Sequence, residues 1–433
     1  MNNTFTPDRS QEKVIELSEG YHLVLAAPGC GKTQILAERV ARAHAAGVTF
    51  ADMLCLTFTN RAARGMQERV GQRIGVAADD LFIGNVHRFC SRFLFDKGLV
   101  PASTSIIDDD DVLSILCDFA GDDEGQVGAN YRRRGRYMEA MQLSHLMFQI
   151  ENTHPRNLRM HPDCLSSDDI QALRTLCKAQ DKDFTAAMMS DIYAHADTYR
   201  DACSDLGAQQ LVFNMLQKMQ LARRYERYKA ANRLLDFEDI LLLAYEHRDL
   251  LPRYRWIQVD EVQDLNPLQL ALIDAMTADN DEQKVCVIYL GDPQQSIFSF
   301  MGAKLSTLDF LRNRCANQIH SLDRNHRSPK YLLDLFNLYA AEQLGIPADL
   351  LPSTDYDPPV IGNELQLYPS DTIDTEYMDA AQQAARLQRD FPEDTTAIIV
   401  NSNHDADGVS SGLKQLGLQR FSSKIQKIAR IVP

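Results

Sequence analysis

The chain has 433 residues, of which 45% are hydrophobic and 24% charged, so it exceeds one ordinary core and two to four globular domains are expected. No apolar run approaches the roughly 18 to 20 residues that span a bilayer, and the N-terminus lacks the layout of a signal peptide, which predicts a cytoplasmic protein without a membrane partner. The formal net charge of −15 argues against non-specific coating of nucleic acid, but it permits a local basic groove, for which residues 131–136 and 223–229 are candidates.

The first hundred residues alternate short apolar runs with helical patterns. Residues 21–27 and 53–58 are predicted strands, and residues 33–46 and 60–74 are predicted helices because their apolar positions recur at helical spacing. This alternating order predicts an α/β fold with a parallel sheet covered by helices.

Between Asp108 and Leu234 the chain changes character. The acidic cluster Asp108–Asp111 suits the start of a helix, where the helix dipole favours negative charge. The stretch that follows shows helical periodicity and few strand signals, so we expect an α-helical insertion. The nine cysteines of the chain lie singly with no CxxC pair, which predicts reduced, mostly buried thiols.

The α/β order resumes after the insertion, with predicted strands at residues 256–259 and 285–290. A third α/β unit is suggested by apolar runs at residues 364–368 and 396–400, each beside a helical pattern. The proline-rich residues 351–360 resemble a surface connection.

A phosphate-binding loop is predicted where residues 26–33 read Ala-Ala-Pro-Gly-Cys-Gly-Lys-Thr between an apolar strand and a helix. Gly29 and Gly31 let backbone N–H groups turn toward phosphate oxygens. Lys32 can reach the β- and γ-phosphates of ATP, and Thr33 offers a hydroxyl to Mg²⁺. The predicted ATP-binding residues of this loop are Ala27, Pro28, Gly29, Cys30, Gly31, Lys32, Thr33 and Gln34.

Two adjacent carboxylates end the predicted strand at residues 256–259. In parallel sheets ligands bind beyond the carboxyl ends of the strands. Asp260 can hold Mg²⁺ through its water shell, and Glu261 can orient and deprotonate the attacking water. The sequence therefore predicts an ATP-hydrolysing site with Lys32, Asp260 and Glu261 as catalytic residues.

Taken together, these motifs resemble those of superfamily 1A DNA helicases of the UvrD/Rep/PcrA type. Residues 291–300 are similar to motif III of that family, and residues 325–328 to the NYRS of motif IV. Residues 236–239 resemble its DFDDL segment, which returns the chain from the insertion to the first motor domain and which we interpret as structural. The resemblance covers nearly the whole chain outside the insertion.

The resemblance implies ATP-site roles for three further residues. Gln11 corresponds to the adenine-reading glutamine of the family. Gln295 corresponds to the glutamine that senses the γ-phosphate. Arg327 corresponds to one of two arginines that stabilise charge on the transferring phosphoryl group.

The resemblance also implies contacts with single-stranded DNA or with single/double-strand junctions. Residues 56–63 are similar to motif Ia and residues 84–90 to the TFHSFC segment, both of which lie along the strand in the family. Aromatic rings stack on bases, while threonine, asparagine and histidine donate to phosphates. The alternative for Phe58 and Phe89 is plain core packing, and the alternative for His87 is a structural histidine whose hydrogen bonds are satisfied within the protein. The predicted DNA-binding residues are Phe58, Thr59, Asn60, His87, Phe298 and Phe300.

The implied architecture is a RecA-like P-loop motor domain with a parallel sheet, split by an α-helical insertion and followed by a partial second RecA-like domain. We expect the first segment of the motor domain at residues 1–107, the insertion at 108–235, the second segment at 236–325 and the partial second domain at 326–433.

No segment after Gly417 resembles motif V or motif VI, so we expect the motor to stop before its second catalytic arginine. In the complete family this architecture is an ATP-driven translocase, usually moving 3′ to 5′; with part of the second domain missing, ATP could bind without fast turnover. The alternative is an ATP-dependent DNA-binding regulatory module that acts with a nuclease or repair partner. A P-loop NTPase unrelated to DNA would leave the aromatic residues of motifs Ia and III without a role.

Overall fold

The computed structural model of the protein describes residues 5–74, 80–128, 131–201, 209–278, 285–292, 294, 305–316, 318–346, 350–360, 362, 364–400 and 402–418. The chain divides into two compact units, Met1–Asp357 and Pro358–Pro433, and each is described by itself. Within the described ranges, no helix has both the length and the apolar character needed to cross a bilayer. The eight cysteines in these ranges are free and buried.

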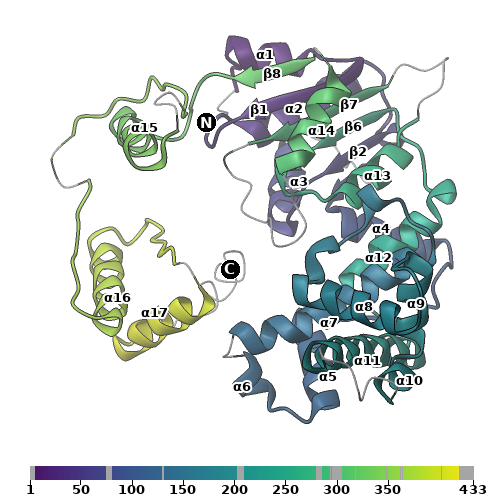
Figure 1. The fold of residues 1–433 in the computed structure, drawn as a ribbon. Coiled ribbons are helices and arrows are strands. Elements are labelled where there is room, and N and C mark those ends of the chain that lie inside the picture. The colour runs from purple at the N-terminus through teal and green to yellow at the C-terminus, as the bar shows by residue number, and fades with distance from the viewer. Residues whose placement is uncertain are drawn as a thin grey trace. The chain divides into compact units, whose positions relative to one another are not determined.

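A six-stranded parallel sheet forms the centre of the first unit, in the order β3-β2-β6-β7-β1-β8 (Figure 1). Its strands are β1 (Gly20–Ala26), β2 (Met53–Leu56), β3 (Phe82–Gly84), β6 (Trp256–Val259), β7 (Cys286–Gly291) and β8 (Ile319–Leu322). In register, Trp256 lies opposite Met53 on one side and Cys286 on the other. Because all strands run the same way, their carboxyl ends share one edge, where ligands bind in such sheets.

Successive side chains along each strand point to opposite faces of the sheet and pack into two separate hydrophobic cores, one on each face. Leu23 and Leu54 pack in one core, whereas their neighbours Val24 and Cys55 pack in the other. The first core is covered by α4 (Val86–Asp96), α12 (Phe237–Glu246), α13 (Pro267–Ala275) and α14 (Leu305–Cys315). The second is covered by α1 (Arg9–Ile15), α2 (Lys32–Ala45) and α3 (Asn60–Ile74). This is the α/β fold with a helix-covered parallel sheet that the sequence predicts.

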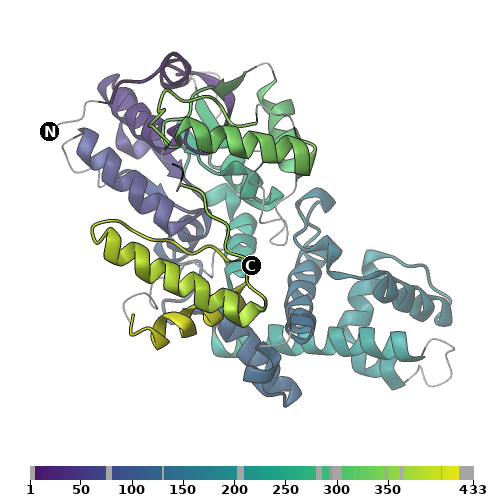
Figure 2. The same cartoon turned by 90° about the vertical axis from the view of Figure 1, so that its left-hand side faces the viewer.

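The insertion between β3 and β6 is helical, as predicted (Figure 1; Figure 2). Its helices are α5 (Asp109–Ala120), α6 (Glu124–Gly128), α7 (Tyr131–Glu151), α8 (Ser167–Ala179), α9 (Ala186–Ala194), α10 (Ala196–Asp201) and α11 (Gln209–Asn232). Asp108 caps α5 and forms a capping box with Asp111, which confirms the predicted helix start. The short parallel strands β4 (Ser105–Ile106) and β5 (Leu234–Leu235) pair where the insertion leaves and rejoins the motor domain.

After the sheet the chain forms α15 (Lys330–Leu344) in the first unit, and α16 (Ile373–Asp390) and α17 (Asn403–Gln415) in the second. α16 and α17 pack through small residues: a Cβ at Gly408 would lie 2.3 Å from the ring of Tyr377, so only glycine permits this approach. Alanines 381 and 384 face Val409 and Leu413 in the same small core.

The prediction of strands at residues 364–368 and 396–400 is wrong. Both segments are described and neither is a strand. Leu367 is 92% exposed and Ile399 is 85% exposed. An extended segment becomes a strand only when a neighbour satisfies its backbone N–H and C=O groups, and no described segment of the second unit pairs with either.

Candidate functional site

The predicted phosphate loop joins β1 to α2 at the carboxyl edge of the sheet. Gly31 is the N-cap of α2, which begins at Lys32. Gly29 and Gly31 have φ values of +86° and +80°, in the left-handed region that favours glycine. A Cβ on Gly29 would lie 2.6 Å from Asn325 Nδ2, and one on Gly31 would lie 2.9 Å from Gln11 Nε2. Both glycines are therefore required by backbone conformation and by close neighbours.

Gln11 lies directly behind this loop. Its side chain is 1% exposed. Its Nε2 donates to the Cys30 carbonyl at 3.1 Å, and its Oε1 accepts from the Asp8 N–H at 3.0 Å. The amide thus ties the N-terminus of α1 to the phosphate loop, and its role toward adenine stays a prediction.

Residues 325–328 lie against the other side of the loop. Asn325 Nδ2 donates to the Pro28 carbonyl at 2.8 Å, and the His326 N–H donates to the Gly29 carbonyl at 2.9 Å. Asn325 Oδ1 accepts the N–H of Arg327 at 2.8 Å. The backbone of the predicted phosphoryl-contacting arginine is therefore held next to the phosphate loop, with its side chain exposed.

The two predicted carboxylates follow β6, beside the loop. Asp260 is 3% exposed and accepts the Glu261 N–H at 3.0 Å. Burial and the negative charge of Glu261 raise the pKa of Asp260 to about 7, although the Lys32 ammonium opposes the shift. Burial and Glu261 also raise the pKa of Asp264 to about 7. Lys32 Nζ donates to the Ala26 carbonyl at 3.1 Å, and its positive charge opposes the raised pKa of both Asp260 and Asp264.

The predicted DNA-binding residues at the start of the chain gather at the same edge of the sheet. Asn60 begins α3, and its Oδ1 accepts from Asn85 Nδ2, at the start of α4, at 3.2 Å. Thr59 Oγ1 accepts the Ala62 N–H at 3.1 Å, which caps α3. The half-buried Phe58 packs against the core.

His87 lies half-buried on α4, where its ring meets the exposed Phe237 edge-on with ring centroids 5.9 Å apart. Burial lowers the pKa of His87, which favours the neutral imidazole. Three further predicted residues, Gln295, Phe298 and Phe300, lie outside the described residues.

Two residues that hold these parts together were not predicted as site residues. Gln263 and Asn325 are each buried and each contact both a catalytic motif and a second segment. Their only sequence signal is that they stand inside the Asp260–Asp264 and Asn325–Ser328 motifs.

The basic stretch at residues 223–229 is engaged within the insertion. Arg224 lies 4.2 Å from the Phe119 ring centre and donates to the Phe119 carbonyl at 2.9 Å. Arg223 lies 5.3 Å from the Tyr193 ring centre, and Lys229 is buried.

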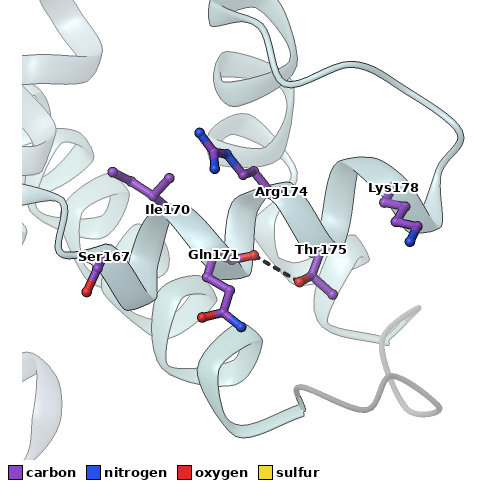
Figure 3. A pocket seen from close by; sticks show the side chains of 6 residues that line it. All are labelled: Ser167, Ile170, Gln171, Arg174, Thr175 and Lys178. Atoms are coloured by element: carbon purple, nitrogen blue, oxygen red, sulfur yellow. Dashed lines mark hydrogen bonds between the residues drawn. The ribbon is translucent and has the colours of Figure 1, made fainter.

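A shallow hollow elsewhere on the insertion is lined by one side of α8, where Thr175 Oγ1 donates to the Gln171 carbonyl (Figure 3). Neither the basic stretch nor the hollow brings together side chains of the kind that catalyse a reaction.

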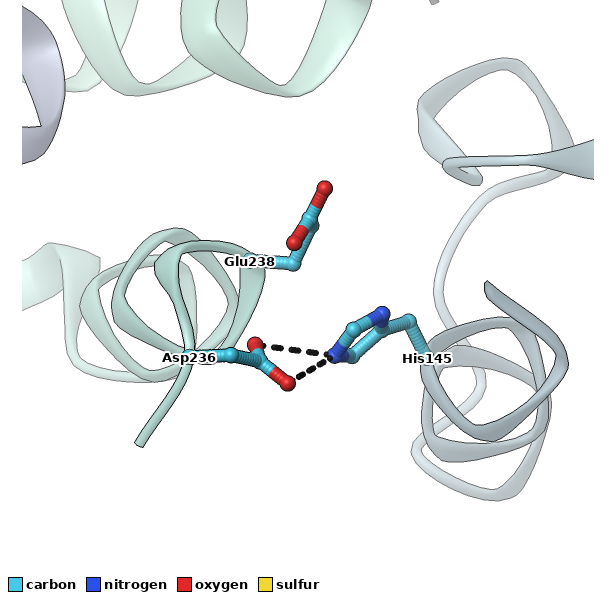
Figure 4. A group of neighbouring side chains, drawn as sticks. All are labelled: His145, Asp236 and Glu238. Atoms are coloured by element: carbon cyan, nitrogen blue, oxygen red, sulfur yellow. Dashed lines mark hydrogen bonds and ion pairs between the residues drawn. The ribbon is translucent and has the colours of Figure 1, made fainter. Parts of the chain in front are cut away.

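A buried cluster of His145, Asp236 and Glu238 has the donor types of a metal site (Figure 4). The ammonium of Lys229, however, already lies 2.7 Å from Asp236 and 2.5 Å from Asp239. The carboxylate of Asp236 is thus already paired with a protein cation. This supports the structural interpretation of residues 236–239.

Comparison with known proteins agrees with this arrangement. Residues 8–316 match the UvrD/REP helicase N-terminal domain, and residues 320–428 match the UvrD-like helicase C-terminal domain. The chain is 27% identical over 340 residues to the ATP-dependent DNA helicase PcrA of Bacillus subtilis, an alignment that covers 76% of this chain and 38% of that protein. It is 28% identical over 342 residues to the ATP-dependent DNA helicase UvrD1 of Mycobacterium bovis, with 75% of this chain and 38% of the relative covered.

The chain thus spans about two fifths of the length of the curated relatives it matches. The N-terminal family match alone covers more than half of the chain, and it includes the phosphate loop and the Asp260–Glu261 pair. The sheet, with its P-loop at the carboxyl edge, is the RecA-like fold of this family. The protein belongs to the UvrD/Rep family of helicases.

Proposed function

We propose that this chain is the core of an ATP-driven DNA helicase or translocase, which binds Mg·ATP and single-stranded DNA and moves 3′ to 5′ in its complete form. One observation carries the proposal. The phosphate loop after β1, the carboxylate pair after β6 and the Asn325–Ser328 segment converge at one edge of the sheet. The relatives named as ATP-dependent DNA helicases support the same function.

ATP would bind with its phosphates in the loop. The left-handed Gly29 and Gly31 leave room for backbone N–H groups to face phosphate oxygens, and the start of α2 adds a partial positive charge. Lys32 would exchange its bond to the Ala26 carbonyl for the β- and γ-phosphates. The other loop residues assigned to ATP, Ala27 to Gln34, would line the phosphates, with Gln11 behind them.

The residues present fit a magnesium ion. Asp260 is a buried carboxyl group whose pKa is raised by burial and by the negative charge of Glu261, and a divalent cation, which prefers such oxygen ligands, would offset both effects. Thr33, on the first turn of α2, and Asp260 would hold the ion, which would neutralise charge on the β- and γ-phosphates. Glu261 would accept a proton from the attacking water.

Arg327 would approach the γ-phosphate from the segment that follows β8. Arginines in this role contribute about 10³ to 10⁵ in rate. Gln295 would sense the same phosphate. We propose that residues 1–107 and 236–325 form the motor domain, with 108–235 inserted, and that residues 326–433 belong to a second motor domain.

Single-stranded DNA, or its junction with a duplex, would cross the edge at the starts of α3 and α4. The paired Asn60 and Asn85 offer amide donors to phosphates, and Thr59 lies beside them. Phe58 and His87 would contact the strand from the same edge, with Phe298 and Phe300 from the motif III segment.

The proposal is tested by ATP binding and by steady-state hydrolysis with and without an oligo-dT strand. Lys32→Ala should abolish nucleotide binding, because it removes the ammonium that faces the phosphates. Glu261→Gln should retain binding and lose hydrolysis. Unchanged nucleotide affinity in Lys32→Ala would refute the phosphate site. Tight binding of ATP and DNA without stimulated hydrolysis would favour a regulatory module that acts with a nuclease or repair partner.

A further inference from the structure

Gln263 occupies the gap between the ends of two neighbouring strands. It follows β6 in the short 3₁₀ turn Val262–Asp264, and its side chain is 1% exposed. Its Nε2 donates to Glu261 Oε2 at 2.8 Å and approaches Asp264 Oδ2 at 3.4 Å. Its Oε1 accepts the N–H of Asp292, just after β7, at 3.0 Å. One amide group therefore joins the proposed general base to the start of the motif III segment.

The chemistry of the two partners requires an amide at this position. An ionised carboxylate only accepts hydrogen bonds, and a backbone N–H only donates. A side chain between them must donate at one end and accept at the other without adding charge to the carboxylate cluster. Glutamine meets this requirement, whereas glutamate cannot donate to Glu261 when ionised and methionine supplies neither bond.

Gly291 makes room for this bridge. A Cβ at Gly291 would lie 2.9 Å from Gln263 Oε1 and 2.7 Å from Val262 Cγ2, so any larger residue would push the amide away from Asp292. Asp292 is itself buried, and its Oδ1 accepts the Gln294 N–H at 2.9 Å. The bridge thus reaches the beginning of the segment to which the sequence assigns contacts with the γ-phosphate and with DNA bases.

We propose that Gln263 is a positioning residue that couples the Asp260–Glu261 pair to the strand-binding segment beginning at Asp292, so that nucleotide and single-stranded DNA change each other's affinity through it. This inference rests on the proposed function. When Mg·ATP draws Glu261 toward the attacking water, the amide that holds Glu261 must either follow or release Asp292. Each ligand then biases the arrangement that the other one meets, and the effect on the two affinities is reciprocal.

The coupling can be measured without hydrolysis. The affinity of the 433-residue chain for a fluorescent oligo-dT is determined with and without Mg²⁺ and the non-hydrolysable adenylyl imidodiphosphate, and the ratio is taken within each variant. We expect a ratio of about 5-fold or more in the wild type. In Gln263→Met the ratio should fall below about 2-fold, since neither bond remains.

Gln258→Met is the matched control. Gln258 is a fully buried glutamine of β6, the strand that leads into the turn of Gln263, and its Nε2 donates to the Leu36 carbonyl at 3.1 Å, away from the carboxylates. The control should keep the wild-type ratio. If Gln263→Met fails to fold by circular dichroism, Gln263→Asn replaces it, because an amide one methylene shorter cannot reach both partners.

The outcomes separate this inference from the function beneath it. A wild type that binds neither ligand refutes the proposed function, and the inference falls with it. A wild type that binds both, with an unchanged ratio in the folded Gln263 variant, overturns the inference alone. Equal loss in Gln258→Met would also overturn it, since the effect would then follow from replacing any buried glutamine in or just after β6.

Discussion

Asp236 balances two buried cations where the insertion meets the motor domain, and Asp236→Asn tests whether that balance stabilises the fold. The carboxylate is 2% exposed. It lies 3.0 Å from His145 Nε2 of α7 (Figure 4). It also lies 2.7 Å from Lys229 Nζ and 2.8 Å from Tyr225 Oη, both of α11. It also caps α12 by accepting the Asp239 N–H at 2.9 Å. Asparagine keeps the size and the cap but removes the charge.

The expected loss is large because the variant leaves an uncompensated charge in the interior. Lys229 and His145 would then keep Asp239 as their shared partner, at 2.5 Å and 3.6 Å, with Glu238 close to His145 only. Removing one partner of a buried ion pair costs about 3–5 kcal/mol, most of it the penalty of the charge left unpaired. We therefore expect the free energy of unfolding of this part of the chain to fall by about that amount.

The pH dependence follows from the pKa shifts of the two partners. Burial would lower the pKa of His145, but Asp236 outweighs it and raises the pKa to about 10. The stabilisation that protonated His145 gives the fold is fully present below roughly pH 6.5, the pKa of histidine in the unfolded chain, and is lost as the pH rises through about 10. Burial would raise the pKa of Asp236, but His145 and Lys229 hold it well below its usual value. The stabilisation that ionised Asp236 gives the fold is present above roughly pH 3.9, the pKa of aspartate in the unfolded chain, and is lost at lower pH.

The assay is urea unfolding at roughly pH 5 to 6, inside the window where both contributions are present. Hydrogen exchange in α11 and α12 identifies the transition to which the change belongs. The control is Asp108→Asn, which alters the same kind of capping box on α5 at an exposed position. It should change stability by less than about 0.5 kcal/mol. Equal, small effects of the two substitutions would refute the reasoning.

Three further predictions concern the parts that support the phosphate loop. Gly29→Ala should weaken ADP binding, measured by calorimetry, about 10-fold or more, because the left-handed backbone strains alanine by about 1–3 kcal/mol and the new Cβ meets the side chain of Asn325. Gly47→Ala is the control: its φ is also positive, at +94°, but the space around it is open, so ADP affinity should not change. Burial lowers the pKa of His22 and of His320, which meet at 3.3 Å between β1 and β8. Tm should therefore fall as the pH drops through roughly 6.5, and His320→Asn should flatten that fall. Arg39→Met should cost about 2–3 kcal/mol in urea unfolding, because this buried guanidinium donates to three carbonyls at the end of α1; a loss below about 0.5 kcal/mol would contradict this.

The elements that were predicted correctly carry their signal locally. The apolar run predicted at residues 21–27 is β1, and the helix predicted at 60–74 is α3 with the same bounds. In each, a continuous apolar run or a 3.6-residue period is set by residues that are neighbours in the chain. Local sequence is then sufficient, because the sheet and its helical cover follow from the alternation of such elements.

Strands at the margin of a sheet depend on distant residues, and here prediction failed in both directions. β8 was not predicted: its exposed Ile319 and half-buried His320 give no apolar alternation, and it exists because β1 offers it hydrogen bonds. Residues 364–368 and 396–400 have the apolar pattern of strands without a described neighbour to pair with. The apolar pattern shows which side chains a segment can bury, whereas a strand forms only when a second segment pairs with its backbone.

The same distinction explains which site residues could be predicted. The catalytic roles of Lys32, Asp260 and Glu261 could be predicted because each side chain is charged and each follows the end of a predicted strand. The residues that hold this site in shape are neutral amides: Gln11 and Gln263, like Asn325, each bridge two segments. An amide both donates and accepts, so it can join a carbonyl or carboxylate to an N–H without changing the charge that phosphate and a metal ion would meet. The chemistry of the side chain marks such a residue only as polar, because its function lies in the pair of partners that the fold brings to it; Gln11 was singled out by the family resemblance alone.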